Sequence, residues 1–76
     1  MPRRFSTAEV EAFLLRSGFV FVRQRGSHKR FRGTLGRRVC NVGLVAGQKQ
    51  IPDGTLAGIA SQLGVSTTEL KRLLAG

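Results

Sequence analysis

The sequence has few of the residues that build disulfides, metal sites or redox sites. It contains one cysteine, Cys40, and one histidine, His28. A single cysteine excludes an internal disulfide and a cysteine-based zinc site, and we expect Cys40 to be a core residue. Tryptophan and tyrosine are absent, so five phenylalanines are the largest apolar side chains. We therefore expect no bound metal and no small-molecule cofactor.

Acidic residues are also scarce. Four aspartates and glutamates stand against 13 lysines and arginines, for a formal net charge of +9. The acids fall near predicted helix starts, where the helix dipole stabilises them, so they form no carboxylate cluster for a metal-dependent nuclease. No acid occurs between Glu11 and Asp53. Such unpaired positive charge repels itself, and nucleic acid is the commonest polyanion that relieves it.

Long apolar runs are missing as well. No stretch reaches membrane-spanning length, and the basic segment of residues 1–6 is not followed by the apolar core of a signal peptide. We therefore expect a cytoplasmic protein that does not bind membranes. The length of 76 residues, 41% of them hydrophobic, predicts one domain over residues 1–76 with a single core.

The residues that are present predict a mixture of helices and strands. Ser6, with Glu9 three residues later, forms a capping box that opens a helix over residues 7–17. β-Branched, aromatic and basic residues predict strands over residues 19–25, 28–32 and 37–42, the last extending as far as 45. Breaks at residues 26–27 and 33–36 separate them. A second helix opens with Asp53 or Thr55 as its cap and ends at Gly64, and a short third helix follows Ser66.

This order predicts an α+β domain in which helices cover one face of a three-stranded antiparallel sheet and leave the other face wet. Alternation along residues 28–32 places His28, Arg30 and Arg32 on the open face. Lys29 and Phe31 then point toward the helices.

His28 is the residue on which catalysis would depend. An imidazole titrates near neutral pH, so it can both accept and release a proton. RNA carries its own nucleophile, the 2′-hydroxyl, and a base among cations suffices to cleave it. The glycine and serine of the same turn suit a close approach to phosphate. The predicted RNA-binding residues are Arg23, Arg25, Gly26, Ser27, Lys29, Arg30, Arg32, Arg37 and Arg38.

Several segments resemble the HicA family of toxins. They are Gly18-Phe19 at a helix end, Val22-Arg23-Gln24, Arg25-Gly26-Ser27-His28, and Pro52-Asp53-Gly54-Thr55-Leu56 opening a helix that closes at Leu63-Gly64. The resemblance runs over most of the chain. It implies a fold like that of the double-stranded-RNA-binding domain, metal-independent cleavage of mRNA with His28 as the catalytic residue, and a HicB-type antitoxin as partner.

The sequence departs from the family pattern after the third strand. Many members carry a second histidine there, whereas residues 42–47 of this chain contain none. If that histidine is the general acid in relatives, two alternatives stay open here: Lys29, Arg30 or water serves as the acid, or the enzyme is slow.

Two other functions remain open at this level. The same basic sheet suits a non-catalytic RNA-binding module that recognises shape and phosphate. Residues 59–73 also resemble a helix-turn-helix, which would place residues 67–75 in a DNA major groove. Two observations count against DNA binding. The last helix has only two basic residues, Lys71 and Arg72, and one acidic residue, Glu69, and most of the positive charge lies on the predicted strands.

Overall fold

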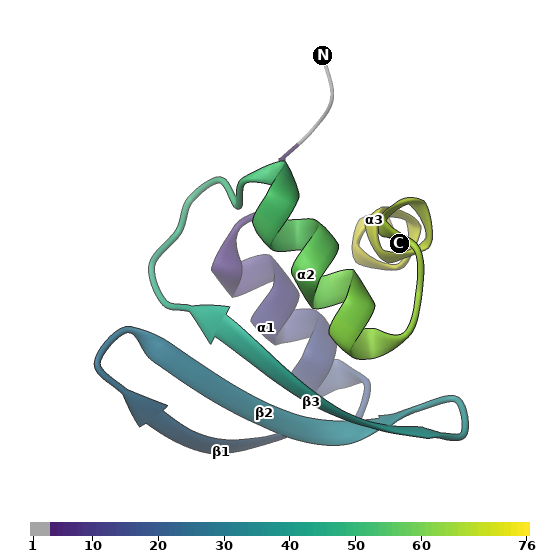
Figure 1. The fold of residues 1–76 in the computed structure, drawn as a ribbon, viewed down its shortest axis with the longest axis horizontal. Coiled ribbons are helices and arrows are strands. Elements are labelled where there is room, and N and C mark those ends of the chain that lie inside the picture. The colour runs from purple at the N-terminus through teal and green to yellow at the C-terminus, as the bar shows by residue number, and fades with distance from the viewer. Residues whose placement is uncertain (1–3) are drawn as a thin grey trace.

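The computed structural model describes residues 4–76, and Figure 1 shows its fold. Along the chain come one helix, three strands and two helices, in the order predicted from the sequence. Their bounds are α1 Thr7–Arg16, β1 Val20–Arg25, β2 His28–Leu35, β3 Arg38–Val45, α2 Asp53–Leu63 and α3 Thr67–Ala75.

The strands form one antiparallel sheet in the order β1-β2-β3. Each connection is a two-residue turn, at residues 26–27 and 36–37. Gly26 and Gly36 have φ of 60° and 64°, while no other residue type in residues 4–76 has positive φ. A glycine at the first central position followed by an ordinary residue is the pattern of a type II′ turn, whose twist matches the flanking strands. Both hairpins are therefore closed by glycine at the place where the backbone requires it.

The helices all lie on one side of the sheet, as Figure 1 shows, and α3 packs against α1 and α2. Apolar side chains from both layers meet between them to form the core. The largest fully buried ones include Phe31 from β2, Leu14 from α1, Leu56 and Leu63 from α2, and Leu70 from α3. Cys40 is 2% exposed and belongs to this core, as predicted. The α+β layout with helices on one face is confirmed.

The capping prediction is confirmed for α1. The Ser6 side chain accepts a hydrogen bond from the Glu9 backbone N–H at 3.1 Å, and the Glu9 carboxylate accepts one from the Ser6 backbone N–H at 3.1 Å. For α2 the prediction is wrong, because Pro52 occupies the cap without a side-chain hydrogen bond and Asp53 is the first helical residue. The carboxylate of Asp53 instead lies in the first turn, where the helix dipole favours it. Gly64 ends α2 in the left-handed conformation, as predicted.

The predicted turn at residues 33–36 is also wrong in its extent. Strand β2 continues through Gly33 and Thr34 to Leu35, and the turn contains only Gly36 and Arg37. Gly33 is needed for packing: a Cβ there would lie 2.5 Å from the Phe19 ring. The glycine therefore makes room inside the sheet for a buried phenylalanine.

Candidate nucleic-acid interface

The face of the sheet that the helices leave uncovered is basic. Along β2, His28, Arg30 and Arg32 are exposed, while Phe31 is buried and Lys29 is only partly exposed. The predicted alternation of this strand is therefore confirmed. On β1, Arg25 lies directly opposite His28, and Arg23 lies opposite Arg30. Because partners across a sheet share a face, these five residues form one surface, which we call the open face.

A β-bulge places the two β1 arginines on that surface. Phe21 pairs with Phe31 on the helix side, and the next paired residue of β1 is Arg23, so Val22 is left out of the register. Without the extra residue, Arg23 would lie opposite Lys29 and point toward the helices. Bulges redirect the side chains that follow them. The bulge therefore turns Arg23 and Arg25 toward His28.

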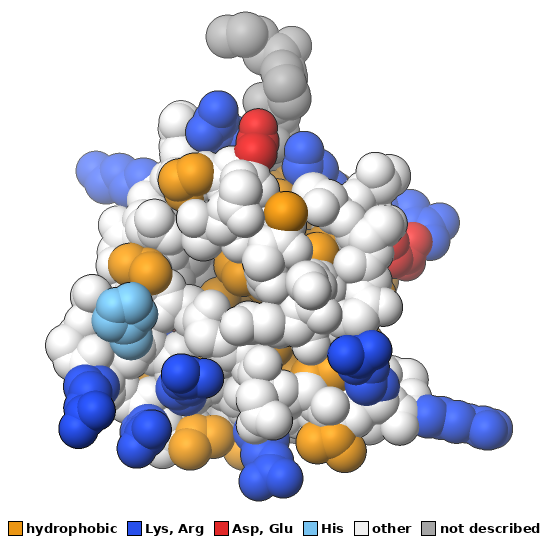
Figure 2. All heavy atoms as spheres, in the orientation of Figure 1, with side chains coloured by type: hydrophobic (Ala, Val, Ile, Leu, Met, Phe, Trp, Pro, Cys, Tyr) orange, Lys and Arg blue, Asp and Glu red, His pale blue; other side chains and the backbone are white. Residues whose placement is uncertain are grey.

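These side chains surround a shallow depression of about 300 Å³, lined by Arg23, Arg25, His28 and Arg30. Figure 2 shows blue cationic side chains gathered along the sheet side of the molecule, with the pale-blue imidazole beside them. A proton-transfer group and three guanidinium groups thus share one small, open hollow. Its size and charge suit a phosphodiester.

The open face has no carboxylate of its own. All four acids belong to helices: Glu9 and Glu11 to α1, Asp53 to α2 and Glu69 to α3. Arg23 and Arg30 are direct cross-strand partners, an arrangement of like charges that destabilises a sheet. The fold therefore carries unfavourable repulsion that a bound polyanion would relieve.

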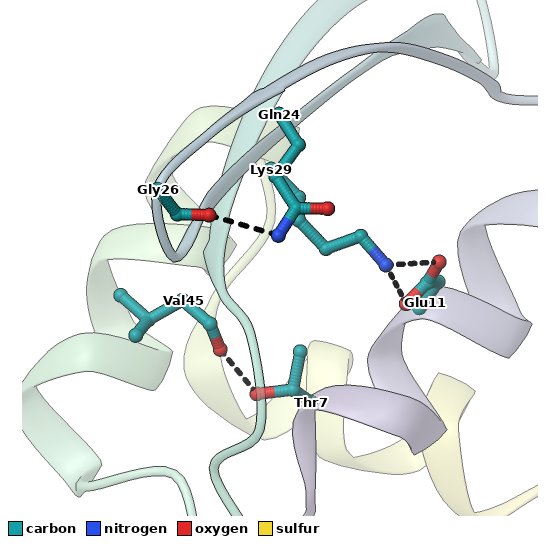
Figure 3. Close-up of polar contacts among 6 residues, drawn as sticks. All are labelled: Thr7, Glu11, Gln24, Gly26, Lys29 and Val45. Carbon is teal, nitrogen blue, oxygen red and sulfur yellow. Dashed lines mark hydrogen bonds and ion pairs between the residues drawn. The ribbon is translucent and has the colours of Figure 1, made fainter.

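Lys29 is placed differently from its neighbours. Its Nζ lies 2.9 Å from both carboxylate oxygens of Glu11 on α1 (Figure 3), so it joins sheet and helix on the covered side. The two side chains are 20% and 26% exposed. The Lys29 Nζ also lies 5.8 Å from the centre of the Phe21 ring. Nearby, the Thr7 hydroxyl donates a hydrogen bond to the Val45 carbonyl at 2.6 Å, a second link between α1 and the sheet (Figure 3).

The turn that precedes His28 is held by two hydrogen bonds. The Gln24 side-chain amide donates to the Gly26 carbonyl at 2.8 Å (Figure 3), and the Ala46 backbone N–H donates to the Ser27 carbonyl at 2.7 Å. Both carbonyls are thereby occupied, while the Ser27 side chain is exposed beside His28. The turn is a fixed edge of the open face.

Arg37 and Arg38, the last two predicted RNA-binding residues, lie at the other end of the sheet. Arg37 is exposed in the second turn. Arg38 is also exposed, and its guanidinium lies against Gly64, where an added Cβ would be 2.8 Å from Nη1. This position at the end of α2 lets the cation interact favourably with the helix dipole. The structure does not bring these two arginines to His28.

Sequence reasoning missed two residues beside the site. A second depression is lined by His28, Lys29, Arg30, Gly43, Leu44, Val45 and Gln62. Gln62 comes from α2, and its side-chain oxygen accepts a hydrogen bond from the Gly43 backbone N–H at 3.1 Å. Gly43 lies opposite Arg30 on the open face. Nothing in the sequence pairs a helix residue with a strand glycine 19 positions earlier, so no local pattern indicates this contact.

The described residues also bear on metal binding and on membrane insertion. Among residues 4–76, no three His, Cys, Asp or Glu side chains come together in a group that could hold a metal ion. No helix in the described part of the chain is long and apolar enough to cross a membrane.

Comparison with known proteins identifies the family. No curated protein and no solved structure matches the chain. The family model described as the HicA toxin of bacterial toxin-antitoxin systems matches residues 7–65, from the start of α1 to just beyond α2. This match covers more than half of the chain and includes the whole sheet. The chain therefore belongs to the HicA toxin family.

Proposed function

We propose that this toxin is an endoribonuclease that cleaves mRNA on the open face, with His28 as its catalytic residue. The observation that carries the proposal is the depression lined by three arginines and the histidine. It combines, without any carboxylate, a group that moves protons with groups that stabilise phosphate charge. Membership of the HicA toxin family supports the toxin role.

The chemistry follows from the substrate. His28 accepts the proton of a ribose 2′-hydroxyl, and the 2′-oxygen forms a bond to the neighbouring phosphorus. The charge that develops on the phosphorane oxygens is stabilised by Arg23, Arg25 and Arg30, which line the same depression. The bond from phosphorus to the 5′-oxygen then breaks. The products are a 2′,3′-cyclic phosphate and a 5′-hydroxyl.

The proton that the leaving oxygen needs comes from water in this proposal. Lys29 is turned to the helix side and bound to Glu11, so it does not face the depression of His28 and the three arginines. Arginine is a poor acid because its guanidinium stays protonated. Arg30 therefore serves as a charge stabiliser, and water acts as the acid.

Phosphate binding is assigned to the cations and the turn that the sequence singled out. Arg23, Arg25, Arg30 and Arg32 hold the strand near His28, with Gly26 and Ser27 at the turn. Arg37 holds it at the far end of the sheet, and Arg38, whose guanidinium lies against Gly64 at the end of α2, contacts it there only beyond the edge of the open face. Lys29 reaches RNA only when its pair with Glu11 opens, so we expect its contribution to be the smallest.

The positive charge of the toxin also indicates the kind of protein that binds it. A toxin of this family works with an antitoxin, and we propose a HicB-type protein whose acidic surface covers His28 and the open face. The net charge of +9 favours an acidic partner.

DNA binding through α2 and α3 has less support. Leu70 of α3 is fully buried, and Arg72 of the same helix forms an ion pair with Glu69. The cations of the open face lie on the strands instead. This arrangement favours RNA on the sheet over a DNA groove on α3.

The decisive experiment compares wild type, His28→Ala and Thr34→Ala on a single-stranded mRNA fragment. Thr34 is the matched control, because it is exposed on the same strand and lines neither depression. We expect His28→Ala to lower the cleavage rate by about 10²- to 10⁴-fold, with RNA affinity within a few-fold of wild type. Thr34→Ala should cleave normally.

The product ends and a modified substrate complete the test. Wild type should leave a 2′,3′-cyclic phosphate, and RNA with 2′-deoxyribose at the cleaved position should resist. Cleavage by His28→Ala at the wild-type rate would overturn the catalytic assignment. Tight RNA binding without any cleavage by wild type would make the protein a binding module.

A further inference from the structure

Gln62 lies at the edge of the candidate site, and the oxygen of its side-chain amide already accepts a hydrogen bond. Its Oε1 accepts the hydrogen bond from the Gly43 backbone N–H at 3.1 Å. A backbone N–H can only donate, so the amide oxygen must face the strand and the NH₂ group must face away from it. The orientation of this side chain is therefore fixed by the edge of β3.

The NH₂ group of Gln62 is a donor that the fold does not use. Within residues 4–76 the amide nitrogen makes no hydrogen bond. Gln62 is exposed and lines the same depression as His28 and Arg30, about 260 Å³ in volume. A helix residue thus reaches past the edge of the sheet and presents a neutral hydrogen-bond donor beside the proposed catalytic histidine.

Gly43 keeps this depression open. It lies opposite Arg30 on the open face, and a Cβ built on it would meet no atom within 4 Å. A larger side chain would project into the depression that Arg30 and Gln62 also line. The glycine has no positive φ to explain its presence, so open space on the surface is the feature it provides.

We infer that Gln62 binds the RNA substrate by donating its amide N–H to a phosphate oxygen next to the cleaved position. This inference rests on the proposed ribonuclease function. Arg30 and His28 line both depressions, so a backbone that crosses the first can continue between Arg30 and Gln62. Gln62 is then a substrate-binding residue of the site, tethered by Gly43.

The test uses two substitutions of Gln62 in the full-length toxin. Gln62→Met removes the donor and keeps the size of the side chain. Gln62→Glu keeps an oxygen for the Gly43 N–H but replaces the donor with a negative charge. We expect kcat/KM for mRNA cleavage to fall by about 10- to 100-fold in Gln62→Met, the effect of one hydrogen bond to a charged group, and further in Gln62→Glu. Ser61→Ala, exposed on the same helix and outside both depressions, should match wild type.

A salt titration distinguishes a neutral donor from a cation. Loss of Gln62 should weaken RNA binding equally at low and moderate salt, because a neutral side chain releases no counterions. The slope of log affinity against log salt should therefore stay at the wild-type value in Gln62→Met. A shallower slope would overturn the inference, since it would mean that the substitution had displaced a cation.

Gly43→Val tests the same depression without touching Gln62. The added side chain has free space and ordinary backbone angles, so the thermal unfolding midpoint should stay near that of wild type. It should fill the path between Arg30 and Gln62 and lower kcat/KM at least 10-fold. Full activity in Gly43→Val would overturn the inference.

The results separate this inference from the proposed function. If wild type cleaves, His28→Ala does not, and both Gln62 variants keep full activity, only the inference is wrong. If wild type never cleaves, the ribonuclease proposal is wrong, and binding of 2′-deoxy-substituted RNA still shows whether Gln62→Met weakens the contact. A loss confined to certain RNA sequences would indicate base recognition and would overturn the phosphate assignment.

Discussion

Alternate residues of strand β2 form two faces that differ in burial and in ion pairing. On the covered face, Phe31 is 1% exposed in the core, and Lys29 pairs with a glutamate of α1. On the open face, His28, Arg30 and Arg32 are exposed with no acid beside them. The covered face buries Phe31 in the core and pairs Lys29 with Glu11 within the chain. The open face leaves its charges for a ligand.

This difference lies in where the charges are placed rather than in how many there are. Lys29 and Arg30 are consecutive, yet one stabilises the fold and the other faces the proposed substrate. The helices supply all of the acids, so the covered face can be neutralised while the open face cannot. A count of basic residues would not separate the two groups.

The largest expected effect lies on the covered face. Phe31→Ala should lower the free energy of unfolding by about 3–5 kcal/mol, because it removes a fully buried aromatic side chain and leaves a cavity. Its neighbour Arg32→Ala should change that free energy by less than about 0.5 kcal/mol, since the side chain is exposed. Chemical denaturation followed by circular dichroism measures both. Equal losses would contradict the assignment of the two faces.

An intermediate effect separates the adjacent cations. Lys29→Met should cost about 1 kcal/mol of stability, because it leaves the Glu11 carboxylate without its partner. It should leave the salt dependence of RNA binding unchanged. Arg30→Met should do the reverse: stability does not fall and rises by up to about 1 kcal/mol, because the repulsion with Arg23 is lost, and the slope of log affinity against log salt falls by about 0.7–1. Denaturation and salt titration of each variant provide the comparison, and a reduced slope in Lys29→Met would place Lys29 on the RNA after all.

The smallest expected effect is a gain in stability. Arg23→Gln removes one member of the cross-strand arginine pair with Arg30, so the free energy of unfolding should rise by about 0.2–1 kcal/mol at low salt. The gain should shrink as salt screens the repulsion, while RNA affinity falls. Lys49→Gln, which lowers the net charge equally from an exposed loop, is the control and should show no such gain. A loss of stability in Arg23→Gln would mean that the repulsion is already relieved within the chain.

Local sequence patterns predicted the fold and the β2 residues of the candidate site. The capping box at Ser6, the strand alternation of residues 28–32 and the glycine at the end of α2 each depend on neighbouring residues, and each is confirmed. The errors arose where a distant residue decides. Gly33 was expected in a turn, yet it lies within β2, where it pairs with Cys40 of β3, and the Phe19 ring occupies the space that a Cβ at this position would need.

The candidate site shows the same division. Alternation alone put His28 and Arg30 on one face. The bulge at Val22, which brings Arg23 and Arg25 to that face, depends on how β1 pairs with β2. Gln62 enters the site only because α2 packs along β3.

By itself, the sequence determined the order of helices and strands, the excess of positive charge and the face of β2 to which the histidine belongs, because these follow from residue periodicity and composition. Only the tertiary structure decided that Lys29 is neutralised by α1, that the β1 arginines turn toward His28 and that Gln62 presents beside it a donor with no hydrogen-bond partner among residues 4–76. Each of these depends on contacts between segments far apart in the chain, and such contacts are set by packing rather than by any local pattern.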